Sequence, residues 1–439
     1  MDTLFSNVTI VTMNEKMDVL FGSYLGVKDG KISYIAKVPP KEQPQEIIDG
    51  TGMVLMPGLV NCHTHLGATA LRCLTDDLSY PEALEQQLMK EDKMDSRAAL
   101  AAVKLGIAEC LRFGITSVSD LYYYPEATAQ AAAEAGIKAN IALSSYRYTD
   151  EGDPFDFEED PQCQLLRRVV EKWNDHDDGR IRIDCGILSQ YTSNHPLWEA
   201  LGRYAHQENL GLQLHLAQEQ LEQDDCMDRT GLGVGELLCC HDLFLNGGVA
   251  AGCNALTEPE MAMLAKKKVS AAVCPTADGK LGRKPAPVLQ LVKSGMNVCL
   301  GTGGVVESTT MDLFEAMRML CADTRRESEN AAALPATAAL MMATVCGARA
   351  QGRSENTGMI KEGFDADLVL VDFSAPHLMP CHNVLSSLVF AAKGGDVALT
   401  MVRGKTLYAN GKFPTIDLGK AVEELTQYAM PRLFENEVK

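Results

Sequence analysis

The chain has 439 residues and a net charge of −19, with 46% hydrophobic and 23% charged residues. This balance indicates a folded protein with a large barrel or two domains, and it argues against nucleic acid or an anionic membrane as a partner. No stretch is apolar enough to span a membrane, the N-terminus lacks a signal-peptide pattern, and the 14 cysteines lack CxxC spacing. We therefore expect a cytoplasmic protein with reduced thiols.

Most of the chain alternates short apolar runs with stretches of helical periodicity, such as 196–208, 257–267, 286–294 and 311–323. The apolar runs number eight: 54–62, 115–119, 138–144, 181–188, 211–217, 247–253, 269–275 and 296–302. Eight such repeats predict an α/β fold of the (β/α)₈ TIM-barrel type. The rival, a doubly wound open sheet, is disfavoured because no glycine-rich phosphate loop opens a helix.

The two ends of the chain have a periodicity closer to two, as in 365–372 and 397–402. We expect them to pair into one small β-sandwich. The predicted units are residues 1–56 plus 358–439 for the sandwich, with a final helix at 418–430, and residues 57–357 for the barrel. The acidic stretch 150–161 (DEGDPFDFEEDP) is typical of an exposed loop.

The strongest chemical signal is the sequence His63-Thr64-His65, which ends the first apolar run. Residues i and i+2 of a strand lie on the same face, so the two imidazoles can bind one metal ion. Active sites of parallel barrels lie at the carboxyl ends of the strands. An isolated HxH pattern is also compatible with a purely structural role, so the surrounding motifs have to decide.

Those motifs run nearly from end to end. They are 56–65 (MPGLVNCHTH), 71–78 (LRCLTDDL), 114–120 (GITSVSD), 179–183 (GRIRI), 296–304 (MNVCLGTGG), 311–317 (MDLFEAM), 358–372 (GMIKEGFDADLVLVD) and 397–408 (VALTMVRGKTLY). In them the chain resembles the amidohydrolase superfamily, specifically the branch of adenosine/S-adenosylhomocysteine-type aminohydrolases and triazine (chloro)hydrolases. The resemblance implies a metal-dependent hydrolase and a homodimer or larger homo-oligomer.

The resemblance also implies the metal ligands. In the family the HxH pair and a histidine that ends the fifth strand hold the ion, and His63, His65 and His215 match these positions. Three imidazoles suffice for a tetrahedral catalytic site with water in the fourth position. The expected cofactor is one divalent ion, zinc first, with iron or manganese as alternatives.

The chain departs from the family at its proton carriers. Gln218 stands where the family has a catalytic glutamate, Gly252 where it has a histidine after the sixth strand, and Gly303 where it has the aspartate of G-T-D-G. On the fourth strand, 188–191 (LSQY) replaces H-x-P-Y, so a substrate-contacting histidine is missing. A glutamine cannot shuttle a proton, and each lost acid or base typically removes ~10²–10⁴-fold in rate.

Several acidic residues are candidate replacements. Glu219 follows the altered catalytic position Gln218, and Glu307 lies on the loop after the eighth strand. Asp278, in 274–281 (CPTADGKL), and Tyr191 are candidate substrate contacts. Each also has a plainer structural interpretation, as a turn, capping, loop or packing residue; the same holds for Asp76 and Asp77, where helix capping or solvation is favoured.

Two functions follow from these observations. The first is a metal-dependent hydrolase whose activated water attacks a C–N bond of a small nitrogen-heterocyclic substrate, with Glu219 or Glu307 protonating the leaving group. The second is a catalytically silent relative that acts as a binding or regulatory protein, because fold alone does not determine function. A lyase or isomerase chemistry that does not need the lost groups is a third possibility. The sequence does not specify the substrate.

Overall fold

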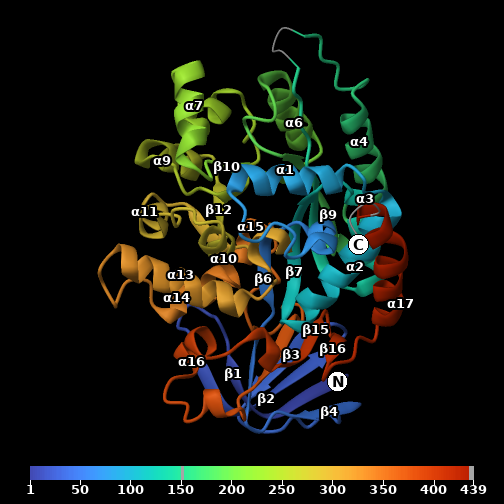
Figure 1. Ribbon diagram of the computed structural model, residues 1–439. Helices are drawn as coiled ribbons and strands as arrows, with labels where there is room; N and C mark the ends of the chain where they lie inside the picture. Colours follow the sequence, from blue (N-terminus) through green and yellow to red (C-terminus); the bar gives the residue numbers. More distant parts are fainter. Residues whose placement is uncertain (150–152, 435–439) are drawn as a thin grey trace.

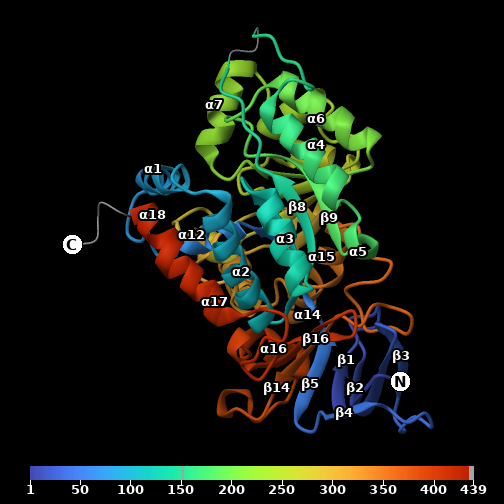
Figure 2. The same ribbon diagram turned by 90° about the vertical axis from the view of Figure 1, so that its right-hand side faces the viewer.

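The structure is a computed structural model that describes residues 1–149 and 153–434. Helices surround a barrel of parallel strands, and a second sheet built from both ends of the chain lies below the barrel in the view of Figure 1. After a rotation of 90°, the helices α17 (Leu418–Glu424) and α18 (Met430–Phe434) are seen along the outside of the barrel, beside α2 (Ser96–Arg112) (Figure 2). Both chain ends therefore contribute to structure outside the barrel.

Eight parallel strands form the barrel, and each pairs with the next one along the chain. They are β6 (Leu59–Thr64), β7 (Ile115–Tyr122), β8 (Lys138–Leu143), β9 (Ile181–Ile187), β10 (Leu212–Leu216), β11 (Gly248–Gly252), β12 (Val269–Val273) and β13 (Asn297–Leu300). A parallel bridge between Thr64 and Gly303 joins the first strand to the segment after the last. Nearly every strand residue is buried, which explains why the runs are continuously apolar. The predicted (β/α)₈ class is confirmed.

The helices of the barrel follow its strands. Their bounds are α1 (Tyr80–Glu91), α2 (Ser96–Arg112), α3 (Pro125–Ala135), α4 (Pro161–Trp173), α5 (His176–Gly179), α6 (His195–Gln207), α7 (Gln220–Thr230), α8 (Val234–Cys240), α9 (Glu258–Lys266), α10 (Pro275–Lys280), α11 (Val288–Lys293), α12 (Val305–Ser308), α13 (Leu313–Glu327), α14 (Ala336–Met342) and α15 (Val345–Ala350). Local signals set several of their starts. Thr257 and Glu260, for example, form a capping box at α9, with a proline in its first turn.

The second sheet combines strands from both ends of the chain. Its order is β16-β15-β14-β5-β1-β2-β3, with β4 paired to β1. The strands are β1 (Thr3–Val11), β2 (Val19–Lys28), β3 (Lys31–Ala36), β4 (Glu46–Asp49), β5 (Met53–Pro57), β14 (Leu368–Asp372), β15 (Val397–Val402) and β16 (Lys405–Ala409). Phe5, Leu25, Leu55, Leu370 and Met401 belong to a separate hydrophobic cluster on it. The α16 helix (Val384–Phe390) lies between β14 and β15 in the chain.

The predicted first barrel strand, 54–62, is in fact two strands. β5 pairs with β14 and β1 in the terminal sheet, whereas β6 begins the barrel. Gly58 lies between them, and a β-carbon there would stand 2.0 Å from the Thr116 hydroxyl oxygen. Periodicity alone cannot detect this division, because both strands are apolar. The need for a glycine at position 58 comes from its contact with Thr116, which only the folded chain shows.

The acidic stretch 150–161 behaves as predicted where it is described. Residues 153–160 form a loop whose side chains are mostly exposed, and α4 begins at Pro161. The Asp160 side chain caps this helix by accepting bonds from two backbone N–H groups of its first turn. Residues 150–152 of the prediction lie outside the described residues.

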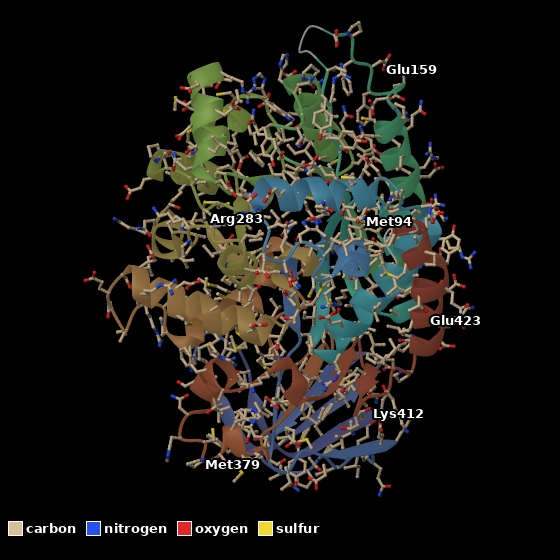
Figure 3. The ribbon with its side chains drawn as sticks, in the orientation of Figure 1. Met94, Glu159, Arg283, Met379, Lys412 and Glu423 are labelled. Carbon is tan, nitrogen blue, oxygen red and sulfur yellow. The ribbon has the colours of Figure 1, made fainter. Side chains whose placement is uncertain are left out.

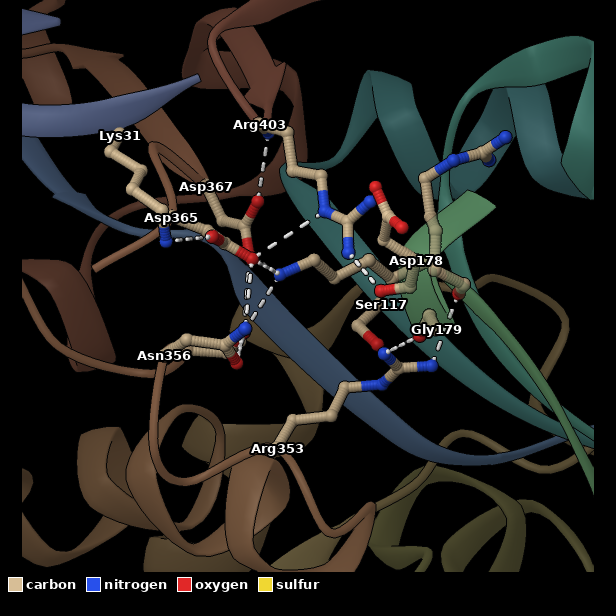
Figure 4. Close-up of polar contacts among 12 residues, drawn as sticks. Lys31, Ser117, Asp178, Gly179, Arg353, Asn356, Asp365, Asp367 and Arg403 are labelled. Atoms are coloured by element: carbon tan, nitrogen blue, oxygen red, sulfur yellow. Dashed lines mark hydrogen bonds and ion pairs between the residues drawn. The ribbon is translucent and has the colours of Figure 1, made fainter. Parts of the chain in front are cut away.

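A buried ionic network joins the amino-terminal side of the barrel to the terminal sheet (Figure 4). The Lys138 ammonium group, at the start of β8, donates to Asp365 Oδ2 at 2.7 Å, to Asp367 Oδ2 at 2.5 Å and to Thr357 Oγ1 at 2.8 Å. Only 1% of the Lys138 side chain is exposed. Nearby, the Arg353 guanidinium donates to four oxygens of the barrel. We call this set the Lys138 cluster: Lys31, Lys138, Arg353, Asn356, Thr357, Asp365, Asp367 and Arg403.

Candidate metal centre

Three histidines converge at the carboxyl ends of the barrel strands. His63 and His65 come from the end of β6, and His215 comes from β10. The Nε2 atom of His215 lies 3.1 Å from that of His63 and 3.2 Å from that of His65. All three side chains are buried. Alternation along β6 places His63 and His65 on the same face of the strand. That face is directed at His215, which comes 150 residues after His65 in the chain.

Backbone carbonyls fix the orientation of two of the rings. His65 Nδ1 donates to the Leu121 carbonyl oxygen at 2.7 Å, and His215 Nδ1 donates to the Leu188 carbonyl oxygen at 2.7 Å. With the proton on Nδ1, each Nε2 carries a lone pair toward the shared centre. Burial, with a smaller contribution from His65, lowers the pKa of His215 to about 3, and burial also holds the pKa of His63 well below its ordinary value. Neutral imidazoles with converging lone pairs fit a divalent metal ion.

Asp120 anchors the segment that carries the HxH pair. Its Oδ1 atom accepts bonds from the Thr64 hydroxyl at 3.0 Å and from the Leu66 N–H at 2.7 Å, while Thr128 binds its Oδ2 atom at 3.0 Å. The aspartate is fully buried at the end of β7. Asp120 belongs to the 114–120 motif, which by itself predicts no role for it; its place near the end of a strand beside the HxH pair is the signal that could have found it.

A carboxylate occupies the space beside Gly303, the glycine that replaces the family's aspartate. Gly303 has φ +70°, and a β-carbon built on it would lie 2.9 Å from Glu307 Oε2. Glu307 lies on α12, and the N–H group of Gly303 donates to the His63 carbonyl at 3.0 Å. The structure thus places the Glu307 carboxylate next to the backbone that carries a proposed metal ligand.

Gly252 and Gln218, the other two positions at which the chain departs from the family, lie against each other. Gly252 has φ +96°, and a β-carbon there would meet the Gln218 Cγ atom at 2.7 Å. The Gln218 side chain therefore fills the position from which a histidine at 252 would project. The backbone N–H group of Gln218 donates to Glu222 Oε2 at 2.9 Å.

Glu219 is turned toward an arginine. Its Oε1 atom lies 3.3 Å from Nε of Arg283, whose side chain is only 4% exposed. Figure 3 places Arg283 in the barrel half of the molecule, below α7 in that view. Glu219 is also the residue that precedes α7, in extended conformation. The ion pair holds the Glu219 carboxylate against a buried guanidinium group, which is the arrangement expected of a residue that positions its neighbours.

Asp278 is buried on α10, one helical turn after the end of β12. Its Oδ2 atom accepts a bond from Asn254 Nδ2 at 2.8 Å. Burial raises the pKa of Asp278 to about 7, and the negative charge of Glu307 adds to the effect. Two residues later, Lys280 pairs with Asp76 at 2.5 Å, so Asp76 connects the segment after β6 to α10.

Tyr191 lies nearer the surface. Its side chain is 48% exposed in the turn that follows β9, within the segment that replaces the family's H-x-P-Y pattern. The Leu188 carbonyl of the same segment is the acceptor for His215 Nδ1. This segment therefore orients a histidine through its backbone, and of its four side chains only that of Tyr191 is exposed.

Two acids with raised pKa values were not found from the sequence. Glu91, at the end of α1, accepts bonds from the Tyr122 hydroxyl at 2.8 Å and from Gln87 at 3.1 Å, and burial raises its pKa. Glu222, in the first turn of α7, has a pKa that burial raises to about 7. Both lie on helices that carry no motif, so only the folded chain shows that their carboxyl groups are removed from water.

Comparisons with known proteins identify the family. Residues 54–407 match the amidohydrolase family. A 5-methylthioadenosine/S-adenosylhomocysteine deaminase of Acetivibrio thermocellus is 32% identical over 95% of this chain and 96% of its own length. The chain belongs to the amidohydrolase family.

Solved structures agree with this membership. An adenosine deaminase from Xanthomonas campestris with bound zinc has a TM-score of 0.91, 27% identity and 98% coverage of both chains. The zinc complex of atrazine chlorohydrolase from Arthrobacter aurescens TC1 has a TM-score of 0.89, 22% identity and coverage of 97% of this chain and all of the other, a likeness of fold alone.

The predicted family and hydrolase class are thereby confirmed, namely an enzyme of the kind that hydrolyses C–N bonds other than peptide bonds. The buried histidine triad supports a divalent metal ion. Across residues 1–149 and 153–434, no helix combines the length and apolar character needed to cross a bilayer.

Proposed function

We propose that this chain is a metal-dependent aminohydrolase that releases ammonia from an adenosine-type heterocycle. We further propose that His63, His65 and His215 hold one divalent ion, with zinc preferred to iron or manganese. The observation that carries the proposal is the convergence of three buried Nε2 atoms, of which His215 Nε2 lies 3.1 and 3.2 Å from the other two. The named deaminase relative supports the substrate class. When bound, such an ion supplies the Lewis acidity that activates water at neutral pH.

Glu307 is the residue that we assign to proton transfer. Its carboxylate stands at the Gly303 position, which the family reserves for a carboxylate, and the glycine at 303 is what leaves room for it. The carboxylate of Glu219, the other candidate from the sequence, is engaged by Arg283. A carboxylate near the reacting centre can take a proton from water and return it to the leaving amine.

Polar groups around the site are assigned to substrate binding. Asp278 and Asn254 form a hydrogen-bonded pair, and Asn254 Oδ1 and Thr276 Oγ1 are buried without a protein partner among the described residues. Such groups match a heterocycle with ring nitrogens and an exocyclic amine. The Gln218 amide cannot carry a proton but can donate a hydrogen bond, and we assign the half-exposed Tyr191 to contact with the substrate.

The proposal includes a cytoplasmic location and a homodimer or larger homo-oligomer. All 14 cysteines are free thiols, which supports a reducing compartment. We keep residues 1–56 plus 358–439 and residues 57–357 as the two proposed units, noting that β5 ends at Pro57 and β6 begins at Leu59.

The test is metal content together with ammonia release. Protein purified without added metal or a metal-binding tag is expected to hold about one zinc, iron or manganese per chain by elemental mass spectrometry, and to deaminate adenosine, methylthioadenosine or S-adenosylhomocysteine. His63→Ala should lose metal and activity together, because two imidazoles bind zinc poorly. His206→Ala, which changes an exposed histidine on α6 that is not part of the triad, is the matched control. Activity that survives loss of the metal would overturn the proposal.

A second candidate function is a binding protein that keeps the site without turnover. The packing of Gln218 against Gly252 favours it, because that arrangement removes two of the family's proton carriers at once. A protein that binds metal and an adenosine analogue but releases no ammonia would establish this alternative.

A further inference from the structure

A cavity lies at the opposite end of the barrel from the histidines. Its volume is about 1170 Å³, and it is lined by the amino-terminal ends of β9 to β13 and by the end of α15. The volume slightly exceeds the range typical of small-molecule sites, which is roughly 300–1,000 Å³. The histidines lie at the carboxyl ends of the same strands, so the two sites are separated by the barrel core.

The walls of this cavity are strongly cationic in a protein whose net charge is −19. Five cationic residues from three separate segments contribute: Arg182, Lys266, Lys267, Lys268 and Arg349. Only two acidic residues, Asp175 and Asp184, line the same space. Such a local reversal of sign attracts anions, since charges inside a recess are screened less than charges on an open surface.

Asp184 contributes little repulsion toward an anion. Its side chain is 5% exposed, and amide groups of Gln213 and Asn140 donate to its carboxylate at distances of 2.9 to 3.4 Å. Burial raises the pKa of this carboxyl group, which disfavours its charged form. The other acid, Asp175, is 3.9 Å from Arg182.

The lysines are held in place by their backbone yet keep their charges available. Lys268 has φ +59°, and the turn packs so closely on Gly247 that a β-carbon there would lie 2.7 Å from the Lys268 carbonyl. Within residues 1–149 and 153–434, none of the three ammonium groups has an ion-pair or hydrogen-bond partner. The Arg182 guanidinium is steadied by a bond to the Gly352 carbonyl at 2.9 Å. Fixed backbone with unpaired cations is the arrangement of an anion receptor rather than of a structural ion network.

We infer that this cavity is a binding site for a small phosphate-bearing anion, separate from the metal centre. The lysines supply point charges to phosphate oxygens, and Arg182 and Arg349 can donate paired N–H groups to them. The ligand is either a free phosphate or pyrophosphate ion or the phosphate group of a metabolite, because both present the same oxygens.

The test is calorimetric titration of the full-length protein with pyrophosphate. Wild type should show one saturable site per chain, whose apparent Kd rises with added sodium chloride. The double variant Lys267→Gln with Arg349→Gln should bind at least ~10-fold more weakly, because two charges near the phosphate are lost. Ribose 5-phosphate and inorganic phosphate, titrated in parallel, distinguish a phosphorylated metabolite from a free ion.

Two controls separate this site from the rest of the molecule. Lys293→Gln neutralises an exposed lysine that does not line the cavity and should leave binding unchanged. His63→Ala should also leave pyrophosphate binding unchanged, so the outcome does not depend on the proposed metal centre. A Kd weaker than ~1 mM for all three probes, or equal binding by wild type and the double variant, would overturn the inference.

Discussion

The two ends of the barrel differ in whether their buried polar groups have partners within the protein. At the Lys138 cluster, a buried ammonium group meets two carboxylates and a hydroxyl, and a buried guanidinium meets four oxygens. At the histidine end, Asn254 Oδ1, Thr276 Oγ1 and Glu222 Oε1 are buried without a protein partner among the described residues. Buried polar groups without a partner cost stability, so a chain retains them where a ligand supplies the missing bonds. The comparison contrasts a fully paired ionic network with polar atoms that are left open beside the proposed metal centre.

The largest expected change in the free energy of unfolding concerns the Lys138 cluster. Lys138→Met should lower the free energy of unfolding by about 3–5 kcal/mol, because it leaves the buried Asp365 and Asp367 without their shared cation. Urea unfolding followed by circular dichroism measures the change. The metal content should not change, since the cluster lies at the other end of the barrel.

Two further variants control this prediction. Asp225→Asn removes an exposed ion pair with Arg229 and should cost no more than ~0.5 kcal/mol. Adding Asp367→Asn to Lys138→Met should restore part of the stability, because one uncompensated charge is removed. A loss below ~1 kcal/mol for Lys138→Met would show that the Lys138 cluster does not stabilise the fold.

The next prediction concerns the pH dependence of stability. The pKa of Glu222 is raised from 4.5 to about 7 by burial, so the folded protein keeps a proton that the unfolded chain releases. Its contribution is therefore fully present below pH 4.5 and is lost as the pH rises to about 7. At 1.36 kcal/mol per pH unit, the difference amounts to about 3 kcal/mol.

Glu222→Gln removes this titration while keeping an oxygen that can accept from the Gln218 N–H group. Between pH 4.5 and 7.5, the variant should gain about 3 kcal/mol relative to wild type in urea unfolding measured at each pH. Parallel stability curves for the two proteins would mean that this carboxyl group is not desolvated in the folded state.

The smallest expected effect in free energy concerns the proposed proton carrier. Glu307→Gln should lower the rate of ammonia release at least ~10²-fold, about 2.7 kcal/mol, with metal content unchanged. Glu219→Gln, at the carboxylate paired with Arg283, should have the smaller effect on turnover. If the Glu219 variant loses more activity than the Glu307 variant, the proton carrier is Glu219 and not Glu307.

Much of the fold could be predicted because its signals are local. The eight apolar runs follow from burial on both faces of each strand, and the helices 195–207 and 258–266 lie within a residue or two of the predicted stretches 196–208 and 257–267. Gly58 shows where this reasoning ends. It divides a run that looks continuous in the sequence, and its reason is contact with Thr116.

The candidate site divides in the same way. The family motifs named all three histidines and the altered positions 218, 252 and 303 from the sequence. They did not reveal that Glu307 occupies the space beside Gly303, or that Arg283 holds Glu219. Those relations depend on side-chain directions in loops, which no short-range pattern encodes.

The sequence by itself thus determined the barrel class, the family and the residue types available for chemistry, because periodicity and motif spacing are properties of neighbouring residues. Only the tertiary structure decided which of those residues meet. Closure of the barrel brings the Nε2 atoms of His215 and His65 within 3.2 Å of each other across 150 residues, and folding buries the Glu91 carboxyl group beside Tyr122. Contacts between residues so far apart in the sequence are set by packing and by closure of the barrel. These contacts distinguish the end of the barrel that carries the proposed metal centre from the end that carries the Lys138 cluster.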